Sequence, residues 1–272
     1  MRLHKPIGIL LLLWPTLWAL WIAAHGIPRL KNLLVFIVGV ILMRSAGCVI
    51  NDFADRKLDL HITRTQSRPL TTGEIPARNA IILFIVLCLL AFILVLLTNL
   101  LTIFLAFFAV IIAIIYPFMK RYTNWPQFIL GVAFSFSIPM AFAAETGHVP
   151  LTAGILMLAT IFWTMAYDTQ YAMIDRDDDV KIGIKSTAIL FGQYDRLMIG
   201  LFQYAAIVLL CILGFLESFL FIYFMAVFIA VLLFIYQQLL IANQESKNCF
   251  RAFLNNQWVG LIIFMGIIFV LK

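Results

Sequence analysis

Two short stretches, residues 51–59 and 175–179, hold seven of the thirteen acidic residues in this chain. Like charges about 4 Å apart repel by roughly 1 kcal/mol per pair even in water, and by more in a half-buried site. Such clusters persist where something positive compensates them. Two aspartate clusters that face one pocket suit Mg²⁺ ions holding a diphosphate, because Mg²⁺ takes carboxylate and phosphate oxygens.

The first cluster has the spacing of one helix face. Asp52, Asp55 and Asp59 lie three and four residues apart, so a helix would present them on one side. Asn51 precedes Asp55 by four residues and Arg44 precedes Asn51 by seven, which puts both on the same stripe. A charged residue inside an apolar segment is costly and usually faces a bundle interior or a wet cavity. The pattern therefore predicts that Arg44 lies below the acidic helix end and points the same way.

The second cluster repeats this pattern. Asp168, Asp175 and Asp179 are separated by seven and four residues, which again indicates one helix face. Asp177 and Asp178 would then point elsewhere, into solvent. The two clusters thus predict two acidic faces that are able to meet in one site.

Basic residues follow each cluster at intervals of four, namely Arg64 and Arg68 after the first, then Lys181 and Lys185 after the second. Each pair would share a face if its segment is helical. Cations beside a carboxylate site would hold the non-bridging oxygens of a diphosphate and stabilise it as a leaving group. A Tyr-x-x-x-Lys motif, Tyr116 to Lys120, ends an apolar segment between the clusters. Taken alone, that motif is typical of anchoring at a membrane interface.

The elements that must position these residues are membrane helices. The chain is 64% hydrophobic and 12% charged, with a mean hydropathy of +1.05. A span needs about 20 apolar residues, whereas a barrel strand would be about ten residues of alternating pattern. The long continuous runs therefore predict an all-α, polytopic membrane protein, a single domain over residues 1–272. The nine expected spans are 7–24, 33–50, 80–98, 100–118, 126–143, 151–171, 196–215, 219–241 and 255–271.

The distribution of basic residues predicts the orientation. If the N-terminus is cytoplasmic, the inside segments carry fifteen of the nineteen Lys and Arg residues and the outside segments carry three, with Arg44 inside a span. This is a strong positive-inside signal, and it places both aspartate clusters on the cytoplasmic side. Segment 7–24 resembles a signal peptide, but eight further spans follow, so we interpret it as the first retained helix. The net charge of +6 then reflects topology, and we find no nucleic-acid module.

Two other interpretations compete with a diphosphate site. Acidic residues at a helix end often only solvate a loop or favour a helix N-terminus. Two clusters on one side, each followed by cations, are less typical of that role. A cation transporter would also use intramembrane carboxylates, but transporters place them near the middle of the membrane. Here they stand at one end of nearly charge-free spans.

The motifs together resemble the UbiA superfamily of intramembrane aromatic prenyltransferases. The family pattern is Asn-Asp-x-x-Asp-x-x-x-Asp in one cytoplasmic loop and Asp-x-x-x-Asp in another, with Tyr-x-x-x-Lys between them. These motifs stand here at residues 51–59, 175–179 and 116–120. Longer matches resemble the bacterial branch that prenylates 4-hydroxybenzoate, at residues 44–52, 68–73, 167–173 and 181–186. The resemblance covers essentially the whole chain and implies a bundle of nine transmembrane helices with cytoplasmic cap loops.

The resemblance also implies a reaction. Two Mg²⁺ ions bridge the aspartates and a polyprenyl diphosphate, the diphosphate leaves, and carbon 3 of 4-hydroxybenzoate attacks the allylic cation. The product is 3-polyprenyl-4-hydroxybenzoate, on the way to ubiquinone. Homogentisate, dihydroxynaphthoate, haem or a chlorophyll precursor stay open as acceptors. The implied partners are the two substrates and the lipid bilayer of a bacterial inner membrane, with no nucleic acid and no obligate protein partner.

The same resemblance divides the site residues by role. Asp55, Asp59, Asp175 and Asp179 are the expected catalytic metal carriers. The full set of expected metal ligands and their supporting residues is Asn51, Asp52, Asp55, Asp59, Asp168, Asp175 and Asp179. The expected diphosphate-binding residues are Arg64, Arg68, Tyr116, Lys120, Lys181 and Lys185. Arg44, together with Asn51, is expected to bind the aromatic acid, because arginine pairs carboxylates in two-point geometry.

Overall fold

The computed structural model describes residues 3–271, and within them every regular element is a helix. Nine helical segments are long and apolar enough to cross a membrane in this part of the chain. The helices are α1 (Ile7–Ala24), α2 (Leu30–Asp55), η1 (Asp59–His61), α3 (Ala77–Val95), α4 (Leu100–Met119), α5 (Pro126–Ser135), α6 (Ser137–Thr146), α7 (Leu151–Ala172), α8 (Arg176–Lys181), α9 (Thr187–Phe191), η2 (Gly192–Tyr194), α10 (Asp195–Leu216), α11 (Phe221–Leu240), η3 (Ile241–Asn243) and α12 (Ser246–Val270).

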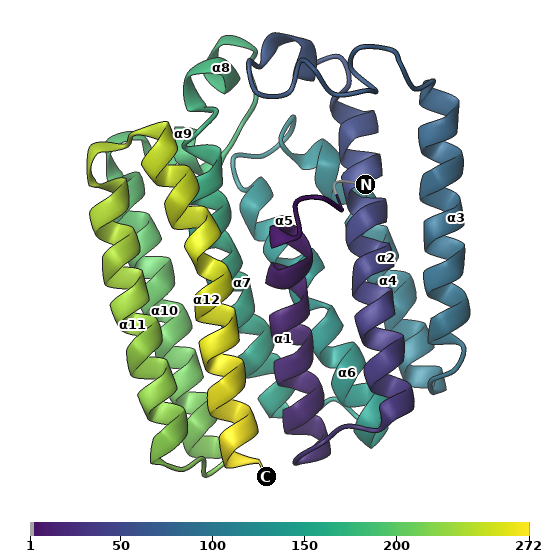
Figure 1. Cartoon of the computed structure of the whole chain (residues 1–272), viewed down its shortest axis with the longest axis vertical. Coiled ribbons are helices and arrows are strands. Elements are labelled where there is room, and N and C mark those ends of the chain that lie inside the picture. Colours follow the sequence, from purple (N-terminus) through teal and green to yellow (C-terminus); the bar gives the residue numbers. More distant parts are fainter. Residues whose placement is uncertain (1–2, 272) are drawn as a thin grey trace.

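The long helices form one bundle, with α10, α11 and α12 on one side and α2, α3 and α4 on the other (Figure 1). Helix α1 packs against α12 and α6 in the middle, and α7 packs against both α10 and α5. The two long connections, from α2 to α3 and from α7 to α10, lie together at one end of the bundle with α8 (Figure 1). We call this the aspartate end, because both acidic clusters lie there.

The predicted all-α fold and the nine spans are confirmed within the described residues, and the main differences concern α2, α12 and the fifth span. Helix α2 continues to Asp55, five residues beyond the predicted span 33–50, and α12 begins at Ser246 rather than at 255. The fifth predicted span, 126–143, splits at Phe136 into α5 and α6. Pro139 has no N–H to donate to the carbonyl of Ser135, so the helical hydrogen-bond ladder is interrupted there.

A tightly packed half of the bundle holds α7 in place. Trp18 of α1 stacks on Trp163 of α7 with ring centroids 5.3 Å apart, and its indole nitrogen donates to the Gly260 carbonyl at 3.0 Å. Buried amides also connect α7 to its neighbours. Gln170 donates to Gln237 of α11 at 3.1 Å and accepts from Asn256 of α12 at 3.0 Å. Buried polar groups are stable in an apolar interior only when they are paired in this way, so the network fixes how α7 faces its neighbours.

Candidate active site

One cavity of about 1240 Å³ opens among α1, α2, α3, α4, α5, α6, α7 and α12. It brings together nearly every site residue that the sequence predicted. The predicted residues that line it are Arg44, Asn51, Asp52, Asp55, Asp59, Arg64, Arg68, Tyr116, Lys120, Asp168, Asp175, Asp179 and Lys185. Of the predicted set, only Lys181 is absent from the cavity lining.

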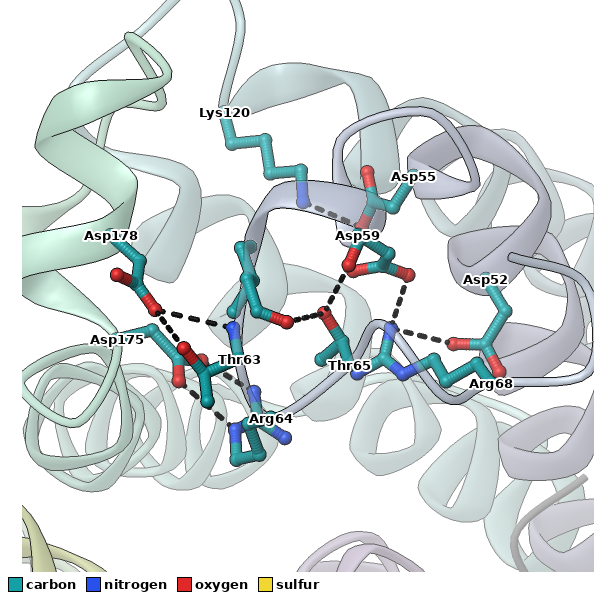
Figure 2. A network of polar contacts seen from close by, with 11 residues as sticks. Asp52, Asp55, Asp59, Thr63, Arg64, Thr65, Arg68, Lys120, Asp175 and Asp178 are labelled. Atoms are coloured by element: carbon teal, nitrogen blue, oxygen red, sulfur yellow. Dashed lines mark hydrogen bonds and ion pairs between the residues drawn. The ribbon is translucent and has the colours of Figure 1, made fainter. Parts of the chain in front are cut away.

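The first cluster occupies the last turn of α2 and the segment that follows. Helix α2 ends at Asp55, and Asp59 begins the separate short helix η1, so the expected single helix face through Asp59 is wrong. Asp55 and Asp59 are nevertheless both buried, with 1% and 2% of their surfaces exposed. Lys120, at the end of α4, places its Nζ 2.5 Å from Asp55 Oδ2 (Figure 2). The other oxygen, Asp55 Oδ1, is buried and has no hydrogen-bond partner among the described residues.

The loop after the first aspartate cluster carries a second basic residue, Arg68, that pairs with this cluster, as Lys120 does. Arg68 places Nη1 2.6 Å from Asp59 Oδ2 and 3.1 Å from Asp52 Oδ1 (Figure 2). The Thr65 hydroxyl donates to the Asp59 carbonyl at 3.2 Å, which holds the turn in shape. This segment forms turns rather than a helix, so Arg64 and Arg68 do not share a helix face as the spacing suggested. Instead, Arg64 extends to the second cluster.

The second cluster lies across the junction of α7 and α8. Helix α7 ends at Ala172, so Asp168 and Asp175 lie on different elements and the predicted common helix face is wrong. Asp175 accepts two hydrogen bonds from Arg64: Nε lies 3.0 Å from Oδ1, and Nη2 contacts Oδ2 (Figure 2). Asp179 is buried beside it. Burial raises the pKa of the Asp179 carboxyl to about 7, and the nearby charge of Asp175 acts in the same direction.

The two acidic loops contact each other directly. Asp178, which the sequence pattern predicted to be solvated, accepts hydrogen bonds from the Thr63 backbone nitrogen at 3.3 Å and from the Thr63 hydroxyl at 3.2 Å (Figure 2). The sequence contains no signal for this pairing, because Thr63 belongs to no motif. Together with the Arg64–Asp175 pair, it closes the first loop onto the second.

The two lysines of the second loop have different surroundings. Lys181 ends α8, and 72% of its side chain is exposed; it pairs with Asp178 at 3.3 Å rather than facing the cavity. Lys185 lies in the coil after α8 and lines the cavity, and its Nζ donates to the Tyr122 carbonyl at 3.3 Å. The expected shared helix face of these two residues is therefore wrong. The Lys185 backbone nitrogen also donates to the Lys120 carbonyl at 2.9 Å, which ties this loop to the end of α4.

Arg44 lies deeper in the cavity, as predicted, and α1 makes room for it. Its Nη1 contacts Cys48 Sγ at 2.7 Å, and its guanidinium carbon lies 5.8 Å from the centre of the Phe134 ring. Its Nε is buried without a hydrogen-bond partner among the described residues. A Cβ atom on Gly8 of α1 would overlap this guanidinium, 2.7 Å from its carbon atom. The part played by Gly8 was not predicted, because a glycine near the start of an apolar helix carries no signal.

The donor set of the site suits Mg²⁺ that is shared with a diphosphate. Within residues 3–271, no three acidic, cysteine or histidine side chains lie close enough to hold an ion by themselves, so the predicted ligands do not form one ready-made metal centre. Mg²⁺ usually takes only one or two carboxylates and completes its shell with water and phosphate oxygens. Asp55 Oδ1 is a buried carboxylate oxygen with free acceptor capacity. The arrangement therefore fits ions held between carboxylates and a bound phosphate group.

Fold and site together define a multi-pass membrane protein whose acidic and basic groups converge at one end of an apolar bundle. The sequence pattern of the UbiA prenyltransferase family matches residues 12–266, and the chain belongs to this family. It is 58% identical to a 4-hydroxybenzoate octaprenyltransferase of Escherichia fergusonii, over 98% of this chain and 92% of the relative. It is 57% identical to an enzyme of the same description from Salmonella paratyphi B, with the same coverage.

Solved structures share the fold. A UbiA homologue from Aeropyrum pernix K1 superposes with a TM-score of 0.85 at 24% identity, covering 99% of this chain and 98% of that one. A UbiA homologue from Archaeoglobus fulgidus, bound to GPP and Mg²⁺, superposes with a TM-score of 0.72 at 19% identity, covering 99% of both chains. At this identity the likeness shows the fold, which is the UbiA fold.

Proposed function

We propose that this protein transfers a polyprenyl group from polyprenyl diphosphate to carbon 3 of 4-hydroxybenzoate, giving 3-polyprenyl-4-hydroxybenzoate and diphosphate, in ubiquinone biosynthesis. The observation that carries the proposal is the cavity of about 1240 Å³, in which two carboxylate clusters and their cations meet a deep apolar space. The names of the 57–58% identical relatives support the same acceptor and a long prenyl donor.

The diphosphate of the donor belongs at the aspartate end. Asp55 and Asp59 on one side and Asp175 and Asp179 on the other are the proposed metal carriers, supported by Asn51, Asp52 and Asp168. Mg²⁺ bound there would neutralise the diphosphate and make it a better leaving group. The proposed ligands of the remaining phosphate oxygens are Arg64, Arg68, Lys120 and Lys185, with Tyr116 one turn below Lys120. Charge-assisted hydrogen bonds from these cations would strengthen as the leaving group gains charge. Lys181 is left out of this set, because its side chain faces away from the cavity.

The chemical step is an electrophilic aromatic substitution. The bond between the allylic carbon and the diphosphate oxygen breaks, and its electron pair leaves with the diphosphate. Carbon 3 of the acceptor, ortho to the hydroxyl group, forms the new carbon–carbon bond and then loses its proton. Bond breaking leaves an allylic carbocation on the prenyl chain. The apolar walls of the cavity keep water away from this carbocation, which would otherwise react with water to give an alcohol.

Arg44 is the proposed partner of the acceptor carboxylate. It is a fixed positive charge within α2, and its Nε has no hydrogen-bond partner among residues 3–271. The guanidinium carbon lies over the Phe134 ring at 5.8 Å from its centre. Arginine pairs with a carboxylate through two parallel hydrogen bonds. We expect Arg44→Ala to raise KM for 4-hydroxybenzoate much more than KM for the diphosphate. Equal effects on both would contradict this assignment.

The aspartate end is proposed to face the cytoplasm of a bacterial inner membrane. The support is the fifteen-to-three distribution of Lys and Arg, since basic residues accumulate in cytoplasmic loops. Both substrates would then reach the site from the cytoplasm or the inner leaflet. A cysteine-labelling experiment on intact cells tests this, with labels placed in the loop at residues 56–76 and in the opposite loop at residues 147–150.

The function is tested by product formation in washed membranes that contain the protein, with labelled 4-hydroxybenzoate and geranyl diphosphate, with and without Mg²⁺. We expect a lipid-extractable prenylated acid that forms only with Mg²⁺. Asp175→Ala should abolish it, whereas Asp177→Ala, an exposed neighbour outside the cavity, serves as the matched control. No product with any acceptor and with longer donors would refute the proposal. Product only with another phenol would keep the chemistry and change the acceptor.

A further inference from the structure

A groove of about 430 Å³ lies between α10 and α11, on the side of the bundle away from α3 (Figure 1). The residues that line it are Arg196, Leu197, Gly200 and Leu201 of α10 and Gln238 of α11. Among the described residues it shares none with the cavity of the candidate active site. Leu197 and Leu201 are 60% and 49% exposed, so the groove opens outward, where a multi-pass membrane protein meets lipid.

A glycine keeps this groove open. A Cβ atom on Gly200 would lie 3.5 Å from Gln238 Nε2, so a methyl group would fit there but a longer side chain would extend into the groove. Gln238 is held back from the space, because its Nε2 donates to Gln203 Oε1 at 2.9 Å. Gln203 is buried and donates in turn to Gln237 at 2.9 Å. The floor of the groove is therefore fixed by the buried amides of α10 and α11.

Arg196 brings a positive charge to the rim of the groove without an acidic partner. Its side chain is exposed, and its guanidinium makes no hydrogen bond or ion pair with any of residues 3–271. The neighbouring Asp195 is fully buried and pairs with Arg176, so that only the backbone nitrogen of Arg196 contacts it. The groove lining contains no carboxylate in the described chain. The charge of Arg196 is thus available to an anion from outside the protein.

The order of polar and apolar groups along the groove follows the layers of a bilayer. Helix α10 has 22 residues and is about 33 Å long, close to the roughly 30 Å hydrocarbon core. Arg196 is its second residue, and Gln238 is the third residue from the end of α11, so both lie at headgroup depth at the aspartate end. Gly200 and Leu201 lie about 6–8 Å deeper, where acyl chains begin.

We propose that this groove binds an anionic phospholipid. Its phosphate pairs with Arg196 through charge-assisted hydrogen bonds, and one acyl chain lies over Gly200 between Leu197 and Leu201. The amide of Gln238 has a second N–H, which can donate to an ester carbonyl below the phosphate. A zwitterionic headgroup fits less well, because its ammonium group finds no carboxylate in the lining. The proposal goes beyond the proposed function and does not depend on it.

The test counts the lipids retained by the purified protein in a nonionic detergent, by native mass spectrometry during titration with phosphatidylglycerol or with phosphatidylethanolamine of the same acyl chains. We expect one phosphatidylglycerol to bind with an affinity about fivefold or more above that of phosphatidylethanolamine. Arg196→Gln should weaken phosphatidylglycerol binding by about fivefold to tenfold, down to the level of the zwitterionic lipid. Gly200→Leu should fill the groove and weaken the binding of both lipids.

Two matched variants control for charge and for size. Arg78 is also exposed and is also the second residue of a membrane helix at the aspartate end, but it lies outside the groove, so Arg78→Gln removes the same charge elsewhere. Gly154→Leu adds the same side chain at an exposed glycine of α7 whose Cβ would meet no atom within 4 Å. At about 0.15 M salt, where charges are screened beyond about 8 Å, both should change phosphatidylglycerol affinity by less than about twofold.

Four results would overturn the proposal. Equal affinities for the two lipids would remove the role of the headgroup charge, and equal losses in Arg196→Gln and Arg78→Gln would show diffuse attraction. Displacement of phosphatidylglycerol by inorganic phosphate at the same concentration would show an anion site without a chain groove. A dimer that Gly200→Leu dissociates would show that a second copy of this chain covers the groove. Thermal unfolding establishes that each variant is folded, and Arg196→Gln, at an exposed position, decides the question even if Gly200→Leu does not insert.

Discussion

Gly8→Ala should impair acceptor binding by displacing Arg44, the proposed partner of the acceptor carboxylate. The added Cβ would lie 2.7 Å from Arg44 Cζ and would also contact Nε and Nη2, whereas ordinary contacts are 3.4–4 Å. The guanidinium is the far end of a flexible side chain, so it yields before the helices do. It must move by about 1 Å, and misplacing a positioning group by that distance can cost about a hundredfold in rate.

The expected result is a rise in KM for 4-hydroxybenzoate of about tenfold to a hundredfold, which corresponds to roughly 1–3 kcal/mol of overpacking or lost contact. KM for the donor diphosphate should change by less than about threefold, because Lys120, Arg64 and Arg68 lie on other segments. The assay is steady-state transfer in membranes with each substrate varied in turn. Combining Gly8→Ala with Arg44→Ala should add little to the effect of Arg44→Ala alone, since both act on one contact.

The matched control is Gly154→Ala. Gly154 is an exposed helical glycine of α7 outside the cavity lining, and an added Cβ there meets no atom within 4 Å. It therefore reproduces the change in helix propensity without the contact with Arg44. An unchanged acceptor KM in Gly8→Ala, or an equal rise for both substrates, would refute the reasoning.

Three further outcomes are expected. Lys120→Met should strongly slow transfer and lower the free energy of unfolding by about 2–3 kcal/mol, because it leaves the Asp55 carboxylate buried without its cation. The cost is smaller than for a fully buried ion pair, because the lysine side chain partly reaches solvent. Lys181→Ala, measured in the same transfer and thermal-unfolding assays, should change both quantities little. Chelation of Mg²⁺ should stop product formation and its re-addition should restore it, whereas restoration by Na⁺ alone would contradict a divalent site. Arg176→Ala should lower the thermal stability in detergent, because Asp195, fully buried in its pair with Arg176, loses its cation; an unchanged Tm would show that this pair does not hold α8.

The positions of the helices and the position of Arg44 below the acidic end of α2 were predictable from the sequence, because both depend on the order of apolar and charged residues within one segment. Long uncharged runs have one stable form in a membrane, so all nine spans were found. The start of α12 was missed because Lys247 and Arg251 belong to a helix that extends beyond the apolar run. The exposed first turns of α12 tolerate these charges. Hydropathy alone does not distinguish such charged helical turns from a loop, so the start of the helix was placed too late.

The pairing of cations with carboxylates was not predictable from the sequence. Spacing placed Arg64 and Arg68 together, yet Arg64 binds Asp175 and Arg68 binds Asp59. These choices depend on how two loops more than a hundred residues apart in the chain fold over each other. The same holds for Thr63 and Asp178, whose contact arises only when α8 lies against the first loop.

The ion pairs explain how one end of an apolar bundle accommodates so many aspartates. Breaking a buried ion pair leaves an uncompensated charge and costs several kcal/mol, so a cluster of acids is stable only if cations come with it. Lys120 comes from the end of α4 and meets Asp55 of α2, and Arg64 comes from the loop after α2 and meets Asp175 beyond α7. Arg68 lies in the same connection as Asp59 but also reaches Asp52 of α2. The pairs therefore link the loops to the helices while they balance the charge. In the proposed reaction the same cations face a diphosphate, so the groups that stabilise the fold are those that would also stabilise the leaving group.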